Sequence, residues 1–105
     1  QLAFMNKHRA IPRVLFSDRL HLESPKLKAV VQKMMDGYVQ SMTRLLEQGV
    51  REGAFRHDLE PEQAARYIVA LIQGLVMRWS VYEFNFSLEK EAEPLWQFLW
   101  PSLKP

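Results

Sequence analysis

The chain has 105 residues, no cysteine and a formal net charge of +2. This length predicts one domain that covers residues 1–105. Disulfides, thiol catalysis and thiolate zinc sites are excluded, and interspersed acids and bases do not by themselves predict a nucleic-acid partner. No apolar run reaches the ~18–20 residues of a membrane span. We therefore expect a cytoplasmic protein that does not enter the membrane.

The first two segments have the pattern of short helices. The apolar residues between Leu2 and His8 indicate the end of a helix, which Pro12 breaks because its ring removes an N–H and restricts the residue before it. A second helix is expected to begin at Pro12. Because the chain starts at Gln1 within a helical pattern, we expect it to be part of a longer protein with a further N-terminal segment.

A long helix is predicted to follow. Ser24 is a good N-cap and Pro25 suits a first helical position, so the two residues mark its start. Apolar residues recur at three- and four-residue steps as far as Val50, and Gly53 is a plausible C-cap. A helix of about 28 residues is about 42 Å long. Residues 54–60 are then a short connector.

The segment 61–83 is apolar on nearly two sides. One side has the spacing of a helix face that packs on a core: Ala64, Ala65, Ile68, Leu71, Ile72, Leu75, Val76, Trp79 and Tyr82. A second apolar flank consists of Ala70, Gly74, Met77 and Val81. Since one core needs only one face, this pattern predicts that a second subunit covers the flank. Gly74 costs roughly 1 kcal/mol of helix propensity, which a close approach of another backbone would explain.

The last predicted helix covers residues 88–103. Its apolar face includes Leu95, Trp96 and Leu99, and Pro94 predicts either a kink or a start nearer Glu93. No segment has a convincing strand pattern. The whole sequence therefore predicts an all-α fold, an antiparallel bundle of about five helices, two of them long.

No constellation of catalytic or metal-binding residues is apparent. The three histidines lie in different segments without a metal-ligand spacing. No serine lies in a Gly-x-Ser-x-Gly turn, and no glycine-rich phosphate loop is present. We therefore predict that the chain is not an enzyme and that it binds neither a metal ion nor a cofactor.

Bulky and flexible side chains are the best candidates for a ligand site. Methionine adapts to irregular space, and tyrosine and tryptophan add a polar group to an apolar wall. For each residue alone, core packing remains an alternative explanation. As a group they predict a pocket between helices for a small hydrophobic or aromatic ligand, lined by Phe4, His8, Phe16, Met34, Tyr38, Met42, Trp79 and Tyr82.

The segment from Leu45 to Leu75 resembles the C-terminal domain of TetR-type transcriptional regulators. A long helix ends in a Gly-x-x-x-Gly-x-Phe turn, an acidic stop follows, and a Pro-Glu with paired alanines precedes an isoleucine–glycine–leucine patch. The matching residues are Gly49, Gly53, Phe55, Asp58, Pro61, Glu62, Ala64, Ala65, Ile72, Gly74 and Leu75. The resemblance covers about residues 8–103 and indicates the type of domain but not its ligand.

This resemblance implies an effector-binding domain that forms a homodimer. In the family, an N-terminal three-helix domain reads DNA, and the last two long helices form the dimer, here 61–83 and 88–103. The implied interface is Ala70, Gly74, Met77, Val81, Leu95, Trp96 and Leu99. The DNA-reading domain is absent from this sequence, so DNA contact, and repression in particular, would belong to the parent protein. The alternative is a helical partner-binding or scaffold module without a small-molecule site, which a packed interior without a cavity would favour.

Overall fold

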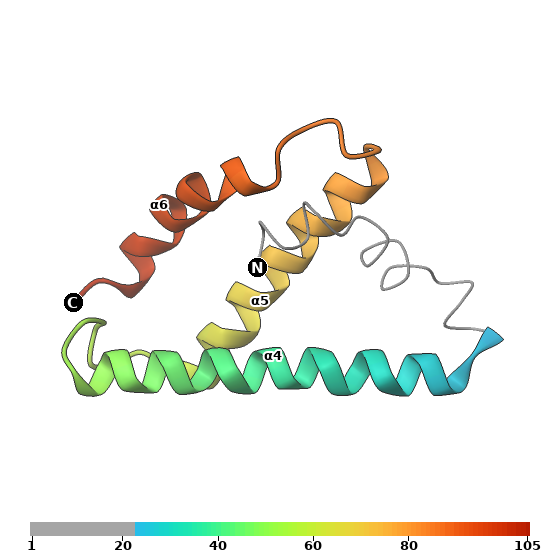
Figure 1. Ribbon diagram of the computed structural model, residues 1–105. Coiled ribbons are helices and arrows are strands. Elements are labelled where there is room, and N and C mark those ends of the chain that lie inside the picture. Colours follow the sequence, from blue (N-terminus) through green and yellow to red (C-terminus); the bar gives the residue numbers. More distant parts are fainter. Residues whose placement is uncertain (1–22) are drawn as a thin grey trace.

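The computed structural model describes residues 23–105, which contain three α-helices and one short 3-10 helix. These are α4 (Pro25–Arg51), α5 (Pro61–Val81), η1 (Glu89–Glu91) and α6 (Ala92–Leu103) (Figure 1). No strand occurs in this part of the chain, so the predicted all-α class is confirmed. The two short helices expected before residue 23 lie outside the described residues.

Local chemistry sets both ends of α4. The hydroxyl of Ser24 accepts a hydrogen bond from the backbone N–H of Leu27 at 3.2 Å, and Pro25 opens the first turn, as predicted. At the other end Gly53 has a φ of 76°, a left-handed conformation that glycine adopts without steric cost. The N–H of Gly53 donates to the carbonyl of Val50 at 3.1 Å. This geometry stops the helix and turns the chain back.

The connector after α4 folds tightly against the helix it has just left. The ring of Phe55 lies directly on Gly49, where a Cβ atom would overlap with it. The backbone N–H of Arg56 then donates to the carbonyl of Leu103 at 2.8 Å, which ties the connector to the end of α6. The sequence spacing of Gly49 and Phe55 is thus explained by the packing of the phenylalanine ring on the glycine.

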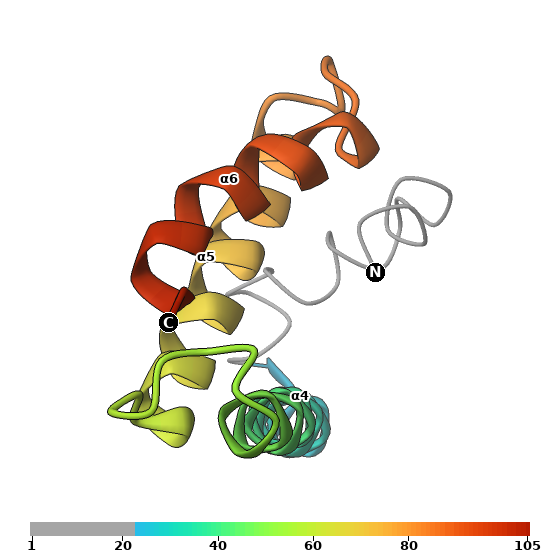
Figure 2. The same ribbon diagram turned by 90° about the vertical axis from the view of Figure 1, so that its left-hand side faces the viewer.

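The three helices share a main apolar core. α5 crosses α4, and α6 runs back antiparallel to α5 (Figures 1 and 2). Figure 2 views α4 nearly end-on, below the α5–α6 pair. The buried residues of this core come from all three helices and the connector: Leu46, Leu59, Ala65, Ile68 and Leu103. Burial of aliphatic side chains, at roughly 1.5–3 kcal/mol each, is therefore what holds the helices together.

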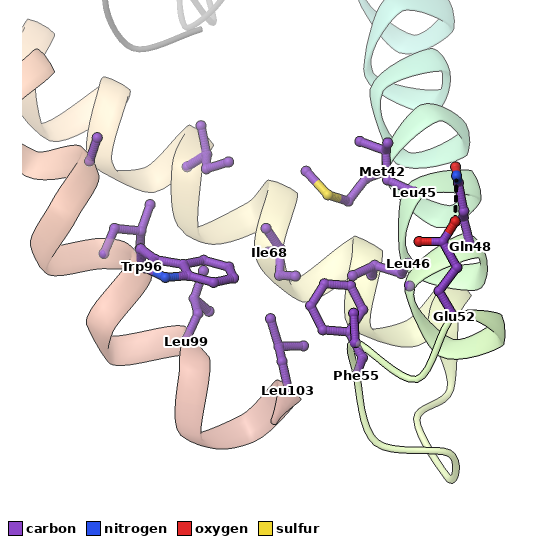
Figure 3. Close-up of a pocket in the computed structure, with 15 residues that line it drawn as sticks. Met42, Leu45, Leu46, Gln48, Glu52, Phe55, Ile68, Trp96, Leu99 and Leu103 are labelled. Carbon is purple, nitrogen blue, oxygen red and sulfur yellow. Dashed lines mark hydrogen bonds between the residues drawn. The ribbon is translucent and has the colours of Figure 1, made fainter. Parts of the chain in front are cut away.

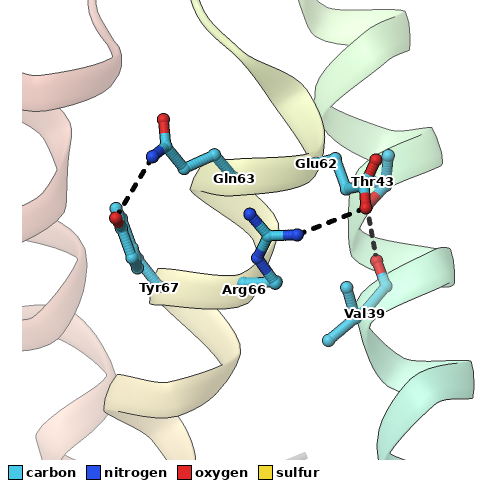
Figure 4. Close-up of polar contacts among 6 residues, drawn as sticks. All are labelled: Val39, Thr43, Glu62, Gln63, Arg66 and Tyr67. Carbon is cyan, nitrogen blue, oxygen red and sulfur yellow. Dashed lines mark hydrogen bonds and ion pairs between the residues drawn. The ribbon is translucent and has the colours of Figure 1, made fainter.

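Polar contacts near the crossing of α4 and α5 join residues within one helix (Figure 4). Arg66 pairs with Glu62 at 3.3 Å, and the hydroxyl of Thr43 donates to the carbonyl of Val39 at 2.7 Å. The ion pair lies on the exposed surface, where such a pair contributes about 0.3–0.5 kcal/mol. These contacts support each helix separately, and the apolar core provides the attachment between helices.

A second core closes the far end of α5. Val76, Trp79 and Leu88 are buried there, and the indole N–H of Trp79 donates to the carbonyl of Phe86 at 3.0 Å. The ring of Phe84 meets that of Trp79 edge-on, with centroids 4.5 Å apart. α5 consequently ends at Val81 rather than at residue 83.

The start of α6 agrees with the one that Pro94 predicted. η1 occupies residues 89–91, and α6 begins at Ala92, so Pro94 falls in the first turn. A proline is tolerated in this turn because its missing N–H would have no intrahelical partner.

Candidate functional site: an apolar groove and an exposed helix flank

An open groove of about 600 Å³ lies between the C-terminal half of α4, the middle of α5, and α6 (Figure 3). Its size is within the range of small-molecule sites, which are mostly apolar clefts of about 300–1,000 Å³. The lining residues are Met42, Leu45, Leu46, Gln48, Gly49, Glu52, Ala54, Phe55, Ile68, Ile72, Ala92, Leu95, Trp96, Leu99 and Leu103.

The groove is built on the main core and opens to solvent between α4 and α6. Its floor is formed by buried side chains, among them Ile68 and Leu103. Leu45 on α4 and Trp96 on α6 stand at its sides, and they are 61% and 45% exposed. Exposed apolar surface of this kind gains about 25 cal/mol per Å² when a ligand or a partner covers it.

Polar groups are confined to one edge of the groove. There the side-chain amide of Gln48 donates to the carboxylate of Glu52 at 3.0 Å, and both residues are exposed (Figure 3). Within the described part of the chain, the lining contains no serine, cysteine, histidine or lysine. Gln48 and Glu52 can form hydrogen bonds with a ligand, but they do not form a nucleophile–base pair. The arrangement is suited to binding.

The structure places one of the predicted ligand residues in this groove, namely Met42. Met34 and Tyr38 lie nearer the start of α4, are each 37% exposed and do not line the groove. Phe4, His8 and Phe16 lie outside the described residues.

The other two predicted ligand residues lie at the far end of α5. Trp79 is 0% exposed in the second core, and its side-chain N–H is already bonded to a carbonyl. Tyr82 follows α5 directly, with the guanidinium of Arg78 4.7 Å from its ring centroid. The structure therefore does not bring Trp79 and Tyr82 together with Met42.

The predicted interface residues of α5 share one exposed flank. Ala70 and Gly74 are exposed, Met77 is 48% exposed and Val81 is 66% exposed. Among the residues that the structure describes, a Cβ atom added to Gly74 would meet nothing within 4 Å. We call Ala70, Gly74, Met77 and Val81 the α5 flank. Residues 23–105 leave its apolar surface uncovered.

Three further residues enlarge this surface, and sequence reasoning missed them as interface candidates. Leu71 had been assigned to the core face but is 42% exposed, and Tyr67 is 61% exposed. On α6, Phe98 is 72% exposed and lines a shallow depression together with Tyr67 and Leu71. Phe98 lies off the spacing of Leu95 and Leu99, and that spacing was the only signal used.

The predicted interface residues of α6 divide between two sides. Trp96 faces the groove. Leu95 also borders a depression that Ala70 and Gly74 line, and Leu99 borders the depression of Phe98. Leu95 and Leu99 thus lie between the groove and the surface that continues the α5 flank.

Two other kinds of site were sought in the described residues. Within residues 23–105, no three His, Cys, Asp or Glu side chains gather as they would around a metal ion. None of the helices described combines the length and the apolar character that a membrane span requires.

Comparison with known proteins identifies the family. A profile of the family described as "Tetracyclin repressor-like, C-terminal domain" matches residues 20–93. The nucleoid occlusion factor SlmA of Glaesserella parasuis serovar 5 (strain SH0165) is 31% identical over 101 residues. That alignment covers 95% of this chain and 49% of the relative, so the chain spans about half the length of this curated relative. No solved structure gives a significant match. Because the family profile covers most of the chain and the helices are the only regular structure in residues 23–105, the chain belongs to the C-terminal domain family of TetR-type regulators.

Proposed function

We propose that this chain is the effector-sensing and homodimerisation domain of a TetR-type regulator. In the parent protein, an N-terminal helix-turn-helix domain would read DNA in the cytoplasm, and effector binding here would release it, as in a repressor. The groove between α4, α5 and α6 is the observation that carries this proposal, because it offers an apolar site of small-molecule size.

Coupling follows from the position of the groove. A ligand that fills it touches all three described α-helices, so its affinity depends on how they are placed relative to one another. It therefore favours the arrangement that it fits best, and by linkage this changes the affinity of the parent protein for DNA. The effector would be a hydrophobic or aromatic molecule, since the lining is almost entirely apolar.

Dimerisation is supported by the uncovered surface of α5 and α6. The α5 flank begins with two small residues, Ala70 and Gly74, which allow a second helix to approach closely. Leu71 and Phe98 add exposed apolar area beside it. We place the second subunit on this surface and leave Trp96 to the groove.

A thermal-shift screen with a matched pair of variants tests the effector site. Leu45 and Val30 are both exposed apolar residues of α4, at 61% and 63%, but only Leu45 lines the groove. A hydrophobic compound present at 100 times its Kd should stabilise the wild type by about 2.7 kcal/mol. Leu45→Asn should weaken this stabilisation, and Val30→Asn should preserve it.

Two results would contradict the proposal. One is a broad set of hydrophobic compounds of which none stabilises the protein. The other is a stabiliser whose effect Leu45→Asn leaves unchanged. The first result would favour the second candidate, a partner-binding module, which the name of the curated relative also supports because it refers to nucleoid occlusion rather than to a small molecule. The second result would mean that the small molecule binds outside the groove.

A further inference from the structure

We infer that the groove takes a lipophilic cation, a ligand with an aromatic body and a positive charge. This inference rests on the proposed effector function and specifies the chemical class of the effector. Three independent features support it: the charges in the lining, the arrangement of the aromatic rings, and the position of the groove at one end of α4.

Among residues 23–105, the lining has a single ionisable side chain, Glu52, and no Lys, Arg or His. The chain as a whole has 14 Lys and Arg residues against 12 Asp and Glu residues. The groove is therefore negatively charged in a chain whose formal net charge is positive. A ligand carboxylate would lose water here without gaining a charged partner, which is costly. A ligand cation, by contrast, gains a charged partner in the Glu52 carboxylate.

The aromatic residues at the groove form a row of packed rings. Trp96 and Trp100 have ring centroids 5.5 Å apart at an interplanar angle of 33°, and Trp100 meets Phe55 at 6.5 Å and 62°. Phe55 and Trp96 line the groove (Figure 3). Tryptophan is the best aromatic partner for a cation within about 6 Å of its ring centre. Because the ring of Trp100 packs against that of Trp96, less ordering of Trp96 is needed when a ligand binds.

The end of α4 adds a partial negative charge on the Glu52 side of the groove, across from Trp96 (Figure 3). Glu52 is the C-cap of α4, and Gln48 and Gly49 belong to its last turn. The C-terminus of a helix is equivalent to roughly half a negative charge, and it favours cations nearby. The end of the helix and the Glu52 carboxylate therefore both attract a bound cation.

Two organic ions of matched size and opposite charge test the inference. Tetraphenylphosphonium and tetraphenylborate have the same shape, so calorimetric titration of each at 150 mM salt isolates the effect of charge. The phosphonium should bind more tightly, although the protein's net charge of +2 favours the borate. Glu52→Gln should weaken phosphonium binding about threefold and leave borate binding equal or stronger.

Matched variants complete the experiment. Glu47 is an exposed carboxylate of the same helix that does not line the groove, so Glu47→Gln should leave both affinities unchanged. Trp96→Leu keeps an apolar side chain at the groove but removes the ring. It should weaken phosphonium binding about threefold.

The outcomes separate this inference from the function on which it rests. Equal or tighter binding of the borate, or a Glu52→Gln variant with unchanged phosphonium affinity, would overturn the cation inference. The effector proposal would then stand, provided that Leu45→Asn still weakens binding of the borate or of a neutral compound. If other hydrophobic compounds bind but neither ion does, the cation inference alone fails. If no compound of any charge binds, both fail.

Discussion

Glu83 and Phe84 have left-handed backbones, with φ values of 56° and 63°, although neither is glycine. Such a conformation costs a residue with a Cβ atom roughly 1–2 kcal/mol. The turn is fixed because the N–H of Phe84 donates to the carbonyl of Trp79 at 2.9 Å and because its ring packs on that of Trp79. Burial of one tryptophan thus imposes an unfavourable conformation on its neighbours.

Replacement of Glu83 by glycine should stabilise the protein. The side chain of Glu83 is exposed, so its loss removes little packing, and the relief of ~1–2 kcal/mol exceeds the ~0.5–1 kcal/mol entropic cost of glycine. We expect a gain of about 0.5–1 kcal/mol in the free energy of unfolding, measured by urea denaturation. Glu89→Gly, in the right-handed turn of η1, is the control and should destabilise. A loss of stability in Glu83→Gly would show that the turn is not strained.

For Trp79 the sequence predicts burial but not the role of the buried side chain. A spacing of three and four residues places it on the buried face of α5, and it is buried. The same spacing does not distinguish a tryptophan that lines a ligand site from one whose N–H is bonded inside a core. That distinction depends on the chain after α5, which no local pattern specifies.

At the scale of elements, the sequence predicts best the ends that local chemistry sets. The start of α4 is set by the Ser24 cap and by the ring of Pro25, and its end by the left-handed turn at Gly53. Its observed bounds agree with the prediction to within about two residues. The end of α5 lies two residues before the predicted one, and packing around Trp79 rather than a local signal determines it. The groove needs α4, α5 and α6 together, so of its lining only Met42 was predicted as a ligand contact.

Two glycines of α4 should respond in opposite ways to alanine. Gly37 has nothing within 4 Å of an added Cβ atom, so Gly37→Ala should stabilise the helix by up to about 1 kcal/mol. Gly49→Ala would push the ring of Phe55 out of place, an overpacking that typically costs about 1–3 kcal/mol. Thermal unfolding of both variants measures the difference.

A double variant tests whether the destabilisation by Gly49→Ala comes from the clash with the ring of Phe55. In a Phe55→Ala background the clash is absent, so Gly49→Ala should become neutral or stabilising. If Gly49→Ala is equally destabilising in both backgrounds, the close packing of Phe55 on α4 is not the reason for a glycine at this position.

At the scale of the whole molecule, the uncovered α5 flank predicts a dimer that a single charge can break. Ala70 is exposed within its own chain, so Ala70→Glu should leave the fold intact but bury an unpaired charge between subunits. We expect monomers by light scattering, with unchanged helix content by circular dichroism. Ala29→Glu makes the same substitution at an exposed site on α4 and should remain dimeric. A monomeric wild type, or an Ala70→Glu variant that stays dimeric, would contradict this interface.

The attachment of α6 has a mechanical consequence. One end of α6 is joined to the connector by the bond from Arg56 to Leu103, and the other end is joined to α5 through the turn around Trp79. α4, by contrast, packs along an extensive contact with α5 that α6 does not match. A guest molecule that wedges the groove apart would therefore displace α6, held at its two ends, rather than separate α4 from α5.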